Sequence, residues 1–497
     1  MHLASLVEMV ESGFDERVLL GSVTAPVTGT EFGRMVRSGA STLPGYTSLV
    51  YAGENHPLLP VALFSAAWAG IPFVPVNYRL EDAHLISLIN RQPGALVLAD
   101  EHTAARLGGI SEPVQLFDEW LINLPAEAPA IDPPFDDDEI AVVLYTSGTT
   151  SEPKAALLRH RHLMAYLLGS VEFGGAGEDE AVLVSVPPYH VAGVANMLSN
   201  TFSGRRLVYL RHFDAATWLN TVRAEAVTHA MVVPTMLARI VEALEGADAG
   251  VPSLRSLSYG GSKVSERVLT AALLAFPSTG FVNAYGLTET ASTIAVLGPD
   301  DHRAAISSDD PAIKRRLSSA GQVLPTIEVE IRDDMEQLVA AGETGMIYLR
   351  GEQISGEYAS GSVLDSDGWF CTRDRGSLDA EGYLFIEGRA DDTIIRGGEN
   401  IAPAEIETVL LAHPAVQEAC VVGIPDDVWG QRIVSAVVLR AGQTVDVEAL
   451  RDYVRHELRG SKTPDTIVFR DSLPHTDTGK MLRRVVLTEL TQSLGQS

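Results

Sequence analysis

The stretch AVVLYTSGTTSEPK, residues 141–154, joins a short apolar run to a loop that contains several hydroxyl side chains, a glycine and a lysine. The apolar run is typical of a buried strand. In the loop, glycine lets backbone N–H groups approach phosphate oxygens, hydroxyl groups donate hydrogen bonds, and lysine supplies positive charge. The Walker A pattern GxxxxGK[ST] is absent, and hydroxyl-rich turns after strands are more often structural. Composition alone therefore suggests a phosphate-binding loop without establishing one.

Apolar runs alternate with amphipathic stretches over most of the chain, which predicts α/β layers with largely parallel sheets. The segment 124–139, rich in proline, alanine and acidic residues, is expected to join two lobes of one large domain. The apolar stretch 59–76 contains three prolines and a glycine, which favour a helix, a loop and a strand over a membrane span. The expected strands are 141–145, 182–186, 206–210, 229–233 and 281–285, and the expected helices are 235–244 and 263–276.

The last part of the chain has a different texture. After about residue 281 the sequence turns to short strands and glycine-rich turns, as in GETGMIYLRG and DAEGYLFIEG. A unit that begins near Gly388 is about 100 residues long, enough for a separate α+β domain. We therefore expect a large domain over residues 1–388 and a small one over 389–497. The predicted elements of the small domain are helices 403–412 and 447–458 and strands 419–423, 433–439 and 466–469.

The 497 residues include 37 basic and 65 acidic side chains, which gives a formal net charge of −28. Such a charge repels nucleic-acid phosphates and anionic membrane surfaces, so neither is an expected partner. Cys371 and Cys420 have no metal-binding spacing and are expected to be buried thiols in a reducing compartment. The acidic N-terminal residues do not resemble a signal peptide. We expect a cytoplasmic protein without an integral membrane segment, as a monomer or a homodimer.

Seven further blocks follow the hydroxyl-rich loop. They are PPYHVAG (187–193), YGGS (259–262), NAYGLTET (283–290), DGWFCTRD (367–374), GRADD (388–392), RGGEN (396–400) and TGKMLRR (478–484). Together with the loop, this order resembles the adenylate-forming superfamily: acyl-CoA synthetases, peptide-synthetase adenylation domains and firefly luciferases. The chain is most like an acyl-CoA synthetase, and the resemblance extends from about residue 77 to the C-terminus.

The resemblance implies a reaction in two steps. A carboxylate attacks the α-phosphorus of ATP to give acyl-AMP and pyrophosphate, and a thiol then attacks the acyl-AMP carbonyl. The implied cofactors are ATP, Mg²⁺ and coenzyme A. The implied fold is α/β: a large N-terminal domain of layered αβ subdomains with a small barrel-like β part, and a small mobile α+β C-terminal domain. Because one site serves both steps, the small domain is expected to rotate.

The resemblance also implies roles for single residues. Lys480 would bridge the substrate carboxylate and the α-phosphate; taken alone, it would be a surface lysine in a basic tail. Glu289 and Thr149 would serve Mg²⁺, Thr288 would donate to phosphate, and His190 would gate the acyl site. Asp391 would be the hinge, with an exposed loop aspartate as the competing interpretation. The implied nucleotide and CoA contacts are Thr146, Ser147, Gly148, Thr149, Thr150, Lys154, Gly260, Gly261, Ser262, Asn283, Ala284, Tyr285, Gly286, Asp374, Arg389, Gly397 and Gly398.

Three features depart from the family's pattern. Arg373 stands where glycine is usual, and a positive φ would cost arginine energy. Lys263 stands where proline is common, and is expected to be a solvated residue at the start of the next helix. Segment 352–365 is shorter than usual and lacks the typical Gly-Tyr-Trp. None of these changes removes a chemical group that the reaction needs.

The His190 block contains no acidic residue that could hold a substrate ammonium, which disfavours an α-amino acid substrate. The expected pocket walls are Val191, Ala192, Val233, Tyr259 and Ala284, so an apolar acid (fatty, aromatic or alicyclic) is expected. The chain is interpreted as a carboxylate–CoA ligase. The alternatives are an acyl-AMP ligase that loads a carrier protein, a luciferase-like monooxygenase and a catalytically inactive binding protein.

Overall fold

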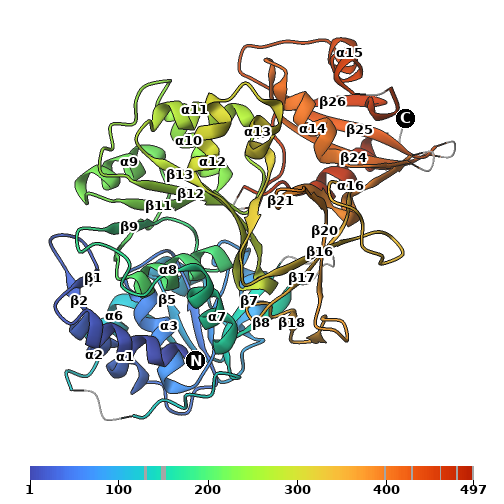
Figure 1. The fold of residues 1–497 in the computed structure, drawn as a ribbon. Coiled ribbons are helices and arrows are strands. Elements are labelled where there is room, and N and C mark those ends of the chain that lie inside the picture. Colours follow the sequence, from blue (N-terminus) through green and yellow to red (C-terminus); the bar gives the residue numbers. More distant parts are fainter. Residues whose placement is uncertain are drawn as a thin grey trace.

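The computed structural model describes residues 1–127, 131–146, 153–396, 399–426, 429–458, 460–476 and 479–494. Figure 1 shows two αβ groups from the N-terminal part of the chain, long antiparallel strands beside them, and a small C-terminal group at one side. This arrangement confirms the expected α/β class. In the described chain, no helix is long and apolar enough to cross a membrane.

The first group is built on one sheet, whose described strands lie in the order β19-β18-β8-β7-β4-β3-β5-β6. Its β3 to β7 part is parallel, whereas β7 and β8 are antiparallel neighbours. Helices α1, α2 and α3 supply much of its apolar core. The bounds are α1 (Leu3–Gly13), α2 (Gly29–Ala40), β3 (Leu49–Ala52), α3 (Leu58–Ala69), β4 (Phe73–Pro75), β5 (Leu96–Ala99), β6 (Val114–Leu116), β7 (Ile140–Thr146), β8 (Lys154–Arg159), β18 (Glu357–Tyr358) and β19 (Gly361–Ser362).

The proline-rich segment 124–139 does not join two lobes, as its composition suggested. It follows α6 (Phe117–Ile122), which comes directly after β6, and leads into β7. Because β6 and β7 belong to the same sheet, the segment crosses one lobe rather than linking two. The apolar stretch 59–76 does form the expected helix and strand, α3 and β4.

The second sheet has 13 described strands, in the order β16-β17-β20-β21-β15-β14-β13-β12-β11-β9-β10-β1-β2. From β13 to β1 neighbouring strands are parallel, as expected, and from β13 to β16 they are antiparallel. The bounds are β1 (Val18–Leu20), β2 (Val27–Thr28), β9 (Ala181–Val184), β10 (Arg206–Tyr209), β11 (His229–Val232), β12 (Ser256–Gly260), β13 (Gly280–Leu287), β14 (Ser292–Leu297), β15 (Gly321–Val323), β16 (Glu328–Arg332), β17 (Gly345–Arg350), β20 (Phe370–Leu378) and β21 (Tyr383–Arg389).

Helices cover the parallel part of this sheet. They are α8 (Val191–Ser203), α9 (Ala215–Ala224), α10 (Pro234–Ala243), α11 (Glu266–Ala275) and α12 (Pro299–Ser307), whereas α7 (His160–Ser170) packs against β8 of the first sheet and against α8. α11 begins three residues later than predicted, because the Ser265 side chain caps it by accepting from the Val268 N–H. Lys263 therefore lies in the turn before the helix.

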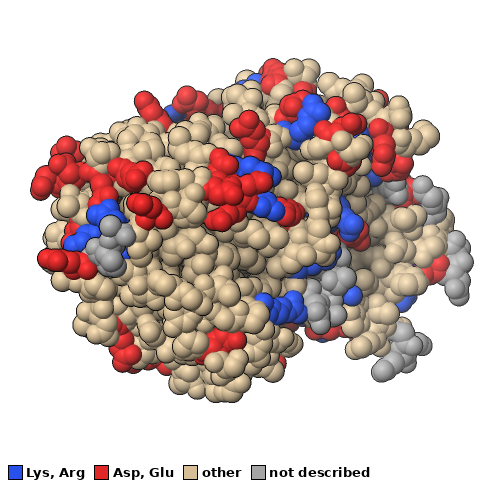
Figure 2. All heavy atoms as spheres, turned by 90° about the horizontal axis from the view of Figure 1, so that it is seen from below, with Lys and Arg blue, Asp and Glu red and all other residues tan. Residues whose placement is uncertain are grey.

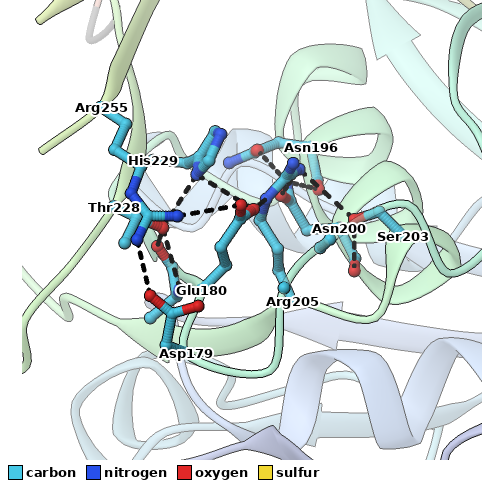
Figure 3. A network of polar contacts seen from close by, with 12 residues as sticks. Asp179, Glu180, Asn196, Asn200, Ser203, Arg205, Thr228, His229 and Arg255 are labelled. Carbon is cyan, nitrogen blue, oxygen red and sulfur yellow. Dashed lines mark hydrogen bonds and ion pairs between the residues drawn. The ribbon is translucent and has the colours of Figure 1, made fainter.

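The two edges of the parallel part carry different side chains. The strands β9, β11 and β12 begin beside a network of charged and polar groups, which Figure 3 shows around Glu180, Arg205 and His229. Their carboxyl ends lead into the YGGS and PPYHVAG blocks. In open α/β sheets, ligands bind outside the carboxyl ends of the strands, so this edge is where we look for a site.

The C-terminal elements form a separate layer around two small apolar cores. The turn η3 (Ala390–Asp392) connects β21 of the large sheet to β22 (Ile394–Arg396), which pairs with β23 (Glu399–Ile401). The remaining elements are α14 (Pro403–Ala412), β24 (Val416–Asp426), β25 (Gly430–Leu439), α15 (Val447–Glu457), β26 (Thr466–Arg470) and α16 (Arg483–Leu494). α14 has the predicted bounds, and β24 is longer than predicted at both ends.

Contacts of Lys263 and Gly479 join the C-terminal layer to the helices of the large sheet. Lys263 is exposed, as expected, and its Nζ also donates to Thr408 Oγ1 of α14 at 3.2 Å. Gly479 packs against Thr235 so closely that an added Cβ would lie 2.0 Å from Thr235 Cγ2. The turn that carries Lys480 is thus seated directly on the N-terminus of α10.

Candidate active site

The carboxyl ends of β12 and β13 hold the residues predicted to receive the adenine. At Gly260 an added Cβ would lie 2.3 Å from the carbonyl oxygen of Ala284, so glycine permits the close approach of these two strands. Gly261 has φ +88°, a left-handed conformation that favours glycine. Asn283 donates from Nδ2 to the Ser319 carbonyl at 3.1 Å. The other predicted residues here are Ser262, which is exposed, and Gly286, which lies against the Ser292 carbonyl.

Asp374 is the centre of a hydrogen-bonded group beside that corner. It is 5% exposed, and it is the register partner of Arg389 across β20 and β21. Tyr285 donates from its hydroxyl to Asp374 Oδ2 at 2.5 Å, and Arg389 Nε lies 2.9 Å from Oδ1. Burial raises the pKa of Asp374, while Arg389 and the Tyr285 hydrogen bond oppose that rise. The contacts hold the carboxylate in a fixed orientation in the middle of β20.

Lys480 is presented by a tight turn. Thr476 N–H donates to the Lys480 carbonyl at 2.8 Å, Gly479 N–H donates to the Thr476 carbonyl at 2.7 Å, and Gly479 has φ +75°. The Lys480 residue is exposed to solvent. Desolvation by the surrounding protein nevertheless lowers its pKa, and the positive charge of Arg389 lowers it further. The carboxylates of Asp374, Asp392 and Glu289 oppose this shift. Lys480 therefore lies within electrostatic range of Arg389, Asp374 and Glu289.

Thr288 and Glu289 lie together in the turn η1 (Thr288–Thr290), directly after β13. Tyr358 donates a hydrogen bond from its hydroxyl to Glu289 Oε1, and Glu289 is half-buried. Within the described chain, no contact engages Oε2. A single carboxylate with a free oxygen fits Mg²⁺, which keeps several waters and also takes phosphate oxygens as ligands. The second predicted metal residue, Thr149, lies outside the described residues.

The two ends of the phosphate-loop candidate are described. Thr146 ends β7, Lys154 begins β8, and the two residues pair in the antiparallel ladder. The Lys154 ammonium lies 5.7 Å from the centre of the Tyr358 ring, within cation–π distance. The predicted contacts Ser147, Gly148, Thr149 and Thr150 lie outside the described residues, as do Gly397 and Gly398.

His190 precedes α8 as its N-cap residue, and its ring lies 4.6 Å from that of Tyr189. Tyr189 in turn packs edge-on against Tyr78 at 5.9 Å, so one aromatic ring contacts the predicted acyl gate and a second packs on that ring. Tyr259 differs from our expectation. Its side chain is 2% exposed and its hydroxyl hydrogen-bonds to His302 at 2.9 Å, so it belongs to the core behind β12 and does not line a pocket.

Two of the residues that depart from the family's pattern contact the site. Arg373 adopts φ +59°, a conformation that costs a non-glycine residue energy. Its guanidinium lies 3.8 Å from the carboxylate of Asp391, the predicted hinge residue in η3.

Tyr358 was missed by sequence reasoning, because it lies in segment 352–365, where the usual motif is absent. The only signal available was an aromatic residue two positions after Gly356.

The surface charge is distributed unevenly. Figure 2 shows Asp and Glu side chains spread over the outer surface, and Lys and Arg side chains near the hollow at the right of the centre of that view. The net charge of −28 therefore coexists with positive groups beside this hollow. Such focusing favours small anionic ligands without favouring a polyanion.

The site can be compared with known proteins. A family model described as AMP-binding enzyme matches residues 34–359, and the model of its C-terminal domain matches residues 405–480. An indoleacetate–CoA ligase from Aromatoleum aromaticum is 31% identical over 462 residues, which cover 89% of this chain and 88% of that protein.

Two solved structures share the whole architecture. The o-succinylbenzoate CoA synthetase from Bacillus subtilis, in complex with its acyl-adenylate intermediate, has a TM-score of 0.83 and 27% identity, with 97% of each chain covered. An amide bond synthetase from Marinactinospora thermotolerans has a TM-score of 0.86 and 27% identity, with 98% of this chain and 99% of that one covered. The chain belongs to the AMP-binding enzyme family.

Proposed function

We propose that this protein is an ATP-dependent carboxylate–CoA ligase that acts on an apolar, aromatic carboxylic acid. The observation that carries this proposal is the convergence of Lys480, Asp374, Arg389 and Glu289, which come from four separate elements of two domains. A reaction that joins a carboxylate to a polyphosphate needs opposing charge and fixed positions above all.

In the first step, Asp374 would accept the ribose hydroxyls, with its orientation held by Tyr285 and Arg389. The ammonium of Lys480 would lie between the substrate carboxylate and the α-phosphate, and would offset their like charges as the new C–O–P linkage forms. Pyrophosphate leaves with the electron pair of the broken P–O bond. Mg²⁺, held by Glu289, would neutralise charge on the phosphate oxygens when bound.

The second step needs the thiol of CoA to reach the acyl carbonyl. The thiol loses its proton as the C–S bond forms, and AMP leaves with the electrons of the acyl C–O bond. Lys480 and the thiol would occupy the same side of the site in turn, so the small domain would rotate about η3 between steps. Asp391 lies in that turn and would be the hinge.

The acid is proposed to be aromatic for two reasons. The residues around His190 are aromatic and apolar, with Tyr189 and Tyr78 in ring contact. Relatives of similar length are named for indoleacetate and for succinylbenzoate, both of which contain an aromatic ring. We further propose that the enzyme works in the cytoplasm as a monomer or a homodimer.

The test is ATP-dependent pyrophosphate release across a panel of aryl, alicyclic and fatty acids, with and without CoA, and with the products identified by mass. We expect release with aryl acids and an acyl-CoA product of matching mass. If pyrophosphate is released but the acyl-AMP reacts only with a holo-carrier protein and not with CoA, the thiol substrate is a carrier protein and the CoA assignment is wrong. Transfer to an added amine but not to CoA would favour an amide-forming enzyme, such as the Marinactinospora relative.

A further inference from the structure

Residues 353–358, here called the bridging segment, connect two parts of the site that lie on different sheets. Gln353 is 2% exposed and donates from Nε2 to the carbonyls of Thr290 and Thr293, each at 2.9 Å. The N–H groups of Ser355 and Gly356 both donate to the Glu289 carbonyl, at 2.8 and 3.1 Å. Hydrogen bonds from this segment therefore hold the backbone of η1, the turn that carries the predicted metal ligand Glu289.

The same segment is attached to β8, the strand that begins with Lys154. Ser355 Oγ donates to the Leu157 carbonyl at 2.5 Å, and Glu357 pairs with Arg159 at 2.6 Å. Tyr358 pairs with Ala156 in the β18–β8 ladder. Every residue from 355 to 358 thus has a partner in η1 or β8, so the distance between the two is set by a short, buried connection.

Tyr358 touches the functional groups at both ends. Its hydroxyl donates to Glu289 Oε1, and the face of its ring lies 5.7 Å from the ammonium of Lys154. We propose that Tyr358 is a positioning residue for the adenylation step, which orients the Glu289 carboxylate toward Mg²⁺ with its hydroxyl and aims Lys154 at the nucleotide phosphates with its ring. This inference rests on the proposed function of the site.

The physical reason is that a free glutamate rotates about three bonds, whereas one fixed oxygen leaves the other in a defined place. A hydrogen bond to a charged group contributes more free energy than a cation–π contact at a partly exposed site. The hydroxyl is therefore expected to matter more than the ring.

The experiment compares Tyr358→Phe, which removes only the hydroxyl, with Tyr358→Ala, which also removes the ring. Calorimetry measures ATP binding with Mg²⁺ and with EDTA, so the readout does not depend on turnover. We expect Tyr358→Phe to weaken ATP binding about tenfold in Mg²⁺ and less than twofold in EDTA. Tyr358→Ala should weaken binding further in both conditions, because Lys154 also loses its ring contact. Tyr348→Phe is the matched control, since that tyrosine stacks with Arg332 at 4.2 Å in β17.

The same variants should slow pyrophosphate release and spare thioester formation from supplied acyl-AMP. In a Glu289→Gln background, Tyr358→Phe should add less than a twofold effect, because the partner of the hydroxyl is already altered. Equal losses in Mg²⁺ and in EDTA, or an undiminished loss in that background, would overturn the proposal. If wild-type protein binds MgATP but activates no acid, the proposed function fails while the binding comparison still decides the role of Tyr358.

Discussion

The two edges of the parallel sheet use charge in opposite ways. At the amino edge, Glu180 pairs with Arg205 at 2.7 Å and with Arg255 at 3.2 Å, and Arg255 also pairs with Asp179 (Figure 3). Beside the carboxyl edge, the predicted site takes Lys154 from β8 of the other sheet and Lys480 from the C-terminal layer, and among the residues that the structure describes no carboxylate forms an ion pair with either. The first edge neutralises its charges within the chain, whereas the second keeps lysines whose partners would be ligand phosphates and a carboxylate.

The comparison teaches that ion pairing and function compete for the same side chains. An arginine held by two carboxylates stabilises the fold but cannot bind substrate. Lys480 has no carboxylate within ion-pair distance among the described residues, and burial beside Arg389 lowers its pKa, so it stabilises the fold little. Substitutions at the two edges should therefore separate stability from activity.

The largest effect is expected from Lys480→Ala. It should reduce acyl-AMP formation by about 100-fold or more, because the charge that offsets the two reacting anions is lost. Thermal stability and thioester formation from supplied acyl-AMP should stay close to wild type. Pyrophosphate release and thioester assays, run on the same preparation, measure the two steps. If both steps fall equally, Lys480 does not serve adenylation alone.

At the amino edge, Glu180→Gln should lower the free energy of unfolding by about 2 kcal/mol, since it leaves Arg205 without its partially buried counter-charge. The acid-activation rate at 25 °C should be unchanged. Chemical denaturation measures the change, and Glu178→Gln, an exposed carboxylate two residues away, is the control. A loss of activity without a loss of stability would reverse our assignment of the two edges.

The pH dependence of stability should also report on the amino edge. Burial, with Arg205, lowers the pKa of His229 from 6.5 to about 4. Between these two pH values the unfolded chain binds a proton that the folded chain does not, so stability falls as the pH drops from about 6.5 toward 4. At pH 5, about 1.5 units below the pKa of the unfolded chain, the expected loss is about 2 kcal/mol. Denaturation of wild type and His229→Gln at pH 7, 6 and 5 tests it; identical slopes would exclude His229 as the cause.

The smallest effect is expected from Arg373→Gly at the carboxyl edge. Glycine adopts φ +59° without strain, which stabilises the folded variant. The loss of the exposed ion pair to Asp391 and the greater entropy of the unfolded glycine chain both destabilise it. The net change in unfolding free energy should stay within about 1 kcal/mol. Arg373→Ala, which keeps the strain and loses the charge, should be the less stable of the two. Thermal midpoints of both variants would show the opposite order if the strain were negligible.

Local pattern was enough to predict much of the fold. The run 141–145 became β7, and the predicted helix 403–412 became α14 with identical bounds. The prediction of largely parallel sheets holds only up to β13, because short strands with glycine-rich turns pair antiparallel beyond it. The linker 124–139 was misassigned because composition marks a loop but does not say which strands it connects.

For the site, motifs indicated which residues to examine, and the structure supplies how they meet. Asp374 and Arg389 become neighbours only through the register of two strands, and Tyr285 reaches Asp374 from 89 positions away. Tyr358 contacts Glu289, which lies 69 positions away in the sequence, and no local periodicity predicts this contact. Contacts of this kind depend on tertiary packing, which one sequence without relatives does not encode in a readable pattern.

The seat of Gly479 on Thr235 has a consequence for reach. Carbon atoms in ordinary contact lie about 3.5–4 Å apart, whereas an added Cβ here would lie 2.0 Å from Thr235 Cγ2. Any side chain at position 479 would therefore push the turn away from α10 by more than an ångström. The Lys480 side chain has a fixed length of four methylene groups. A displaced turn would therefore leave its ammonium farther from the predicted site in the large domain, by about the same distance. Because Gly479 has no side chain, the turn can lie directly against α10, and this contact sets how far the small domain can extend the Lys480 ammonium toward the large one.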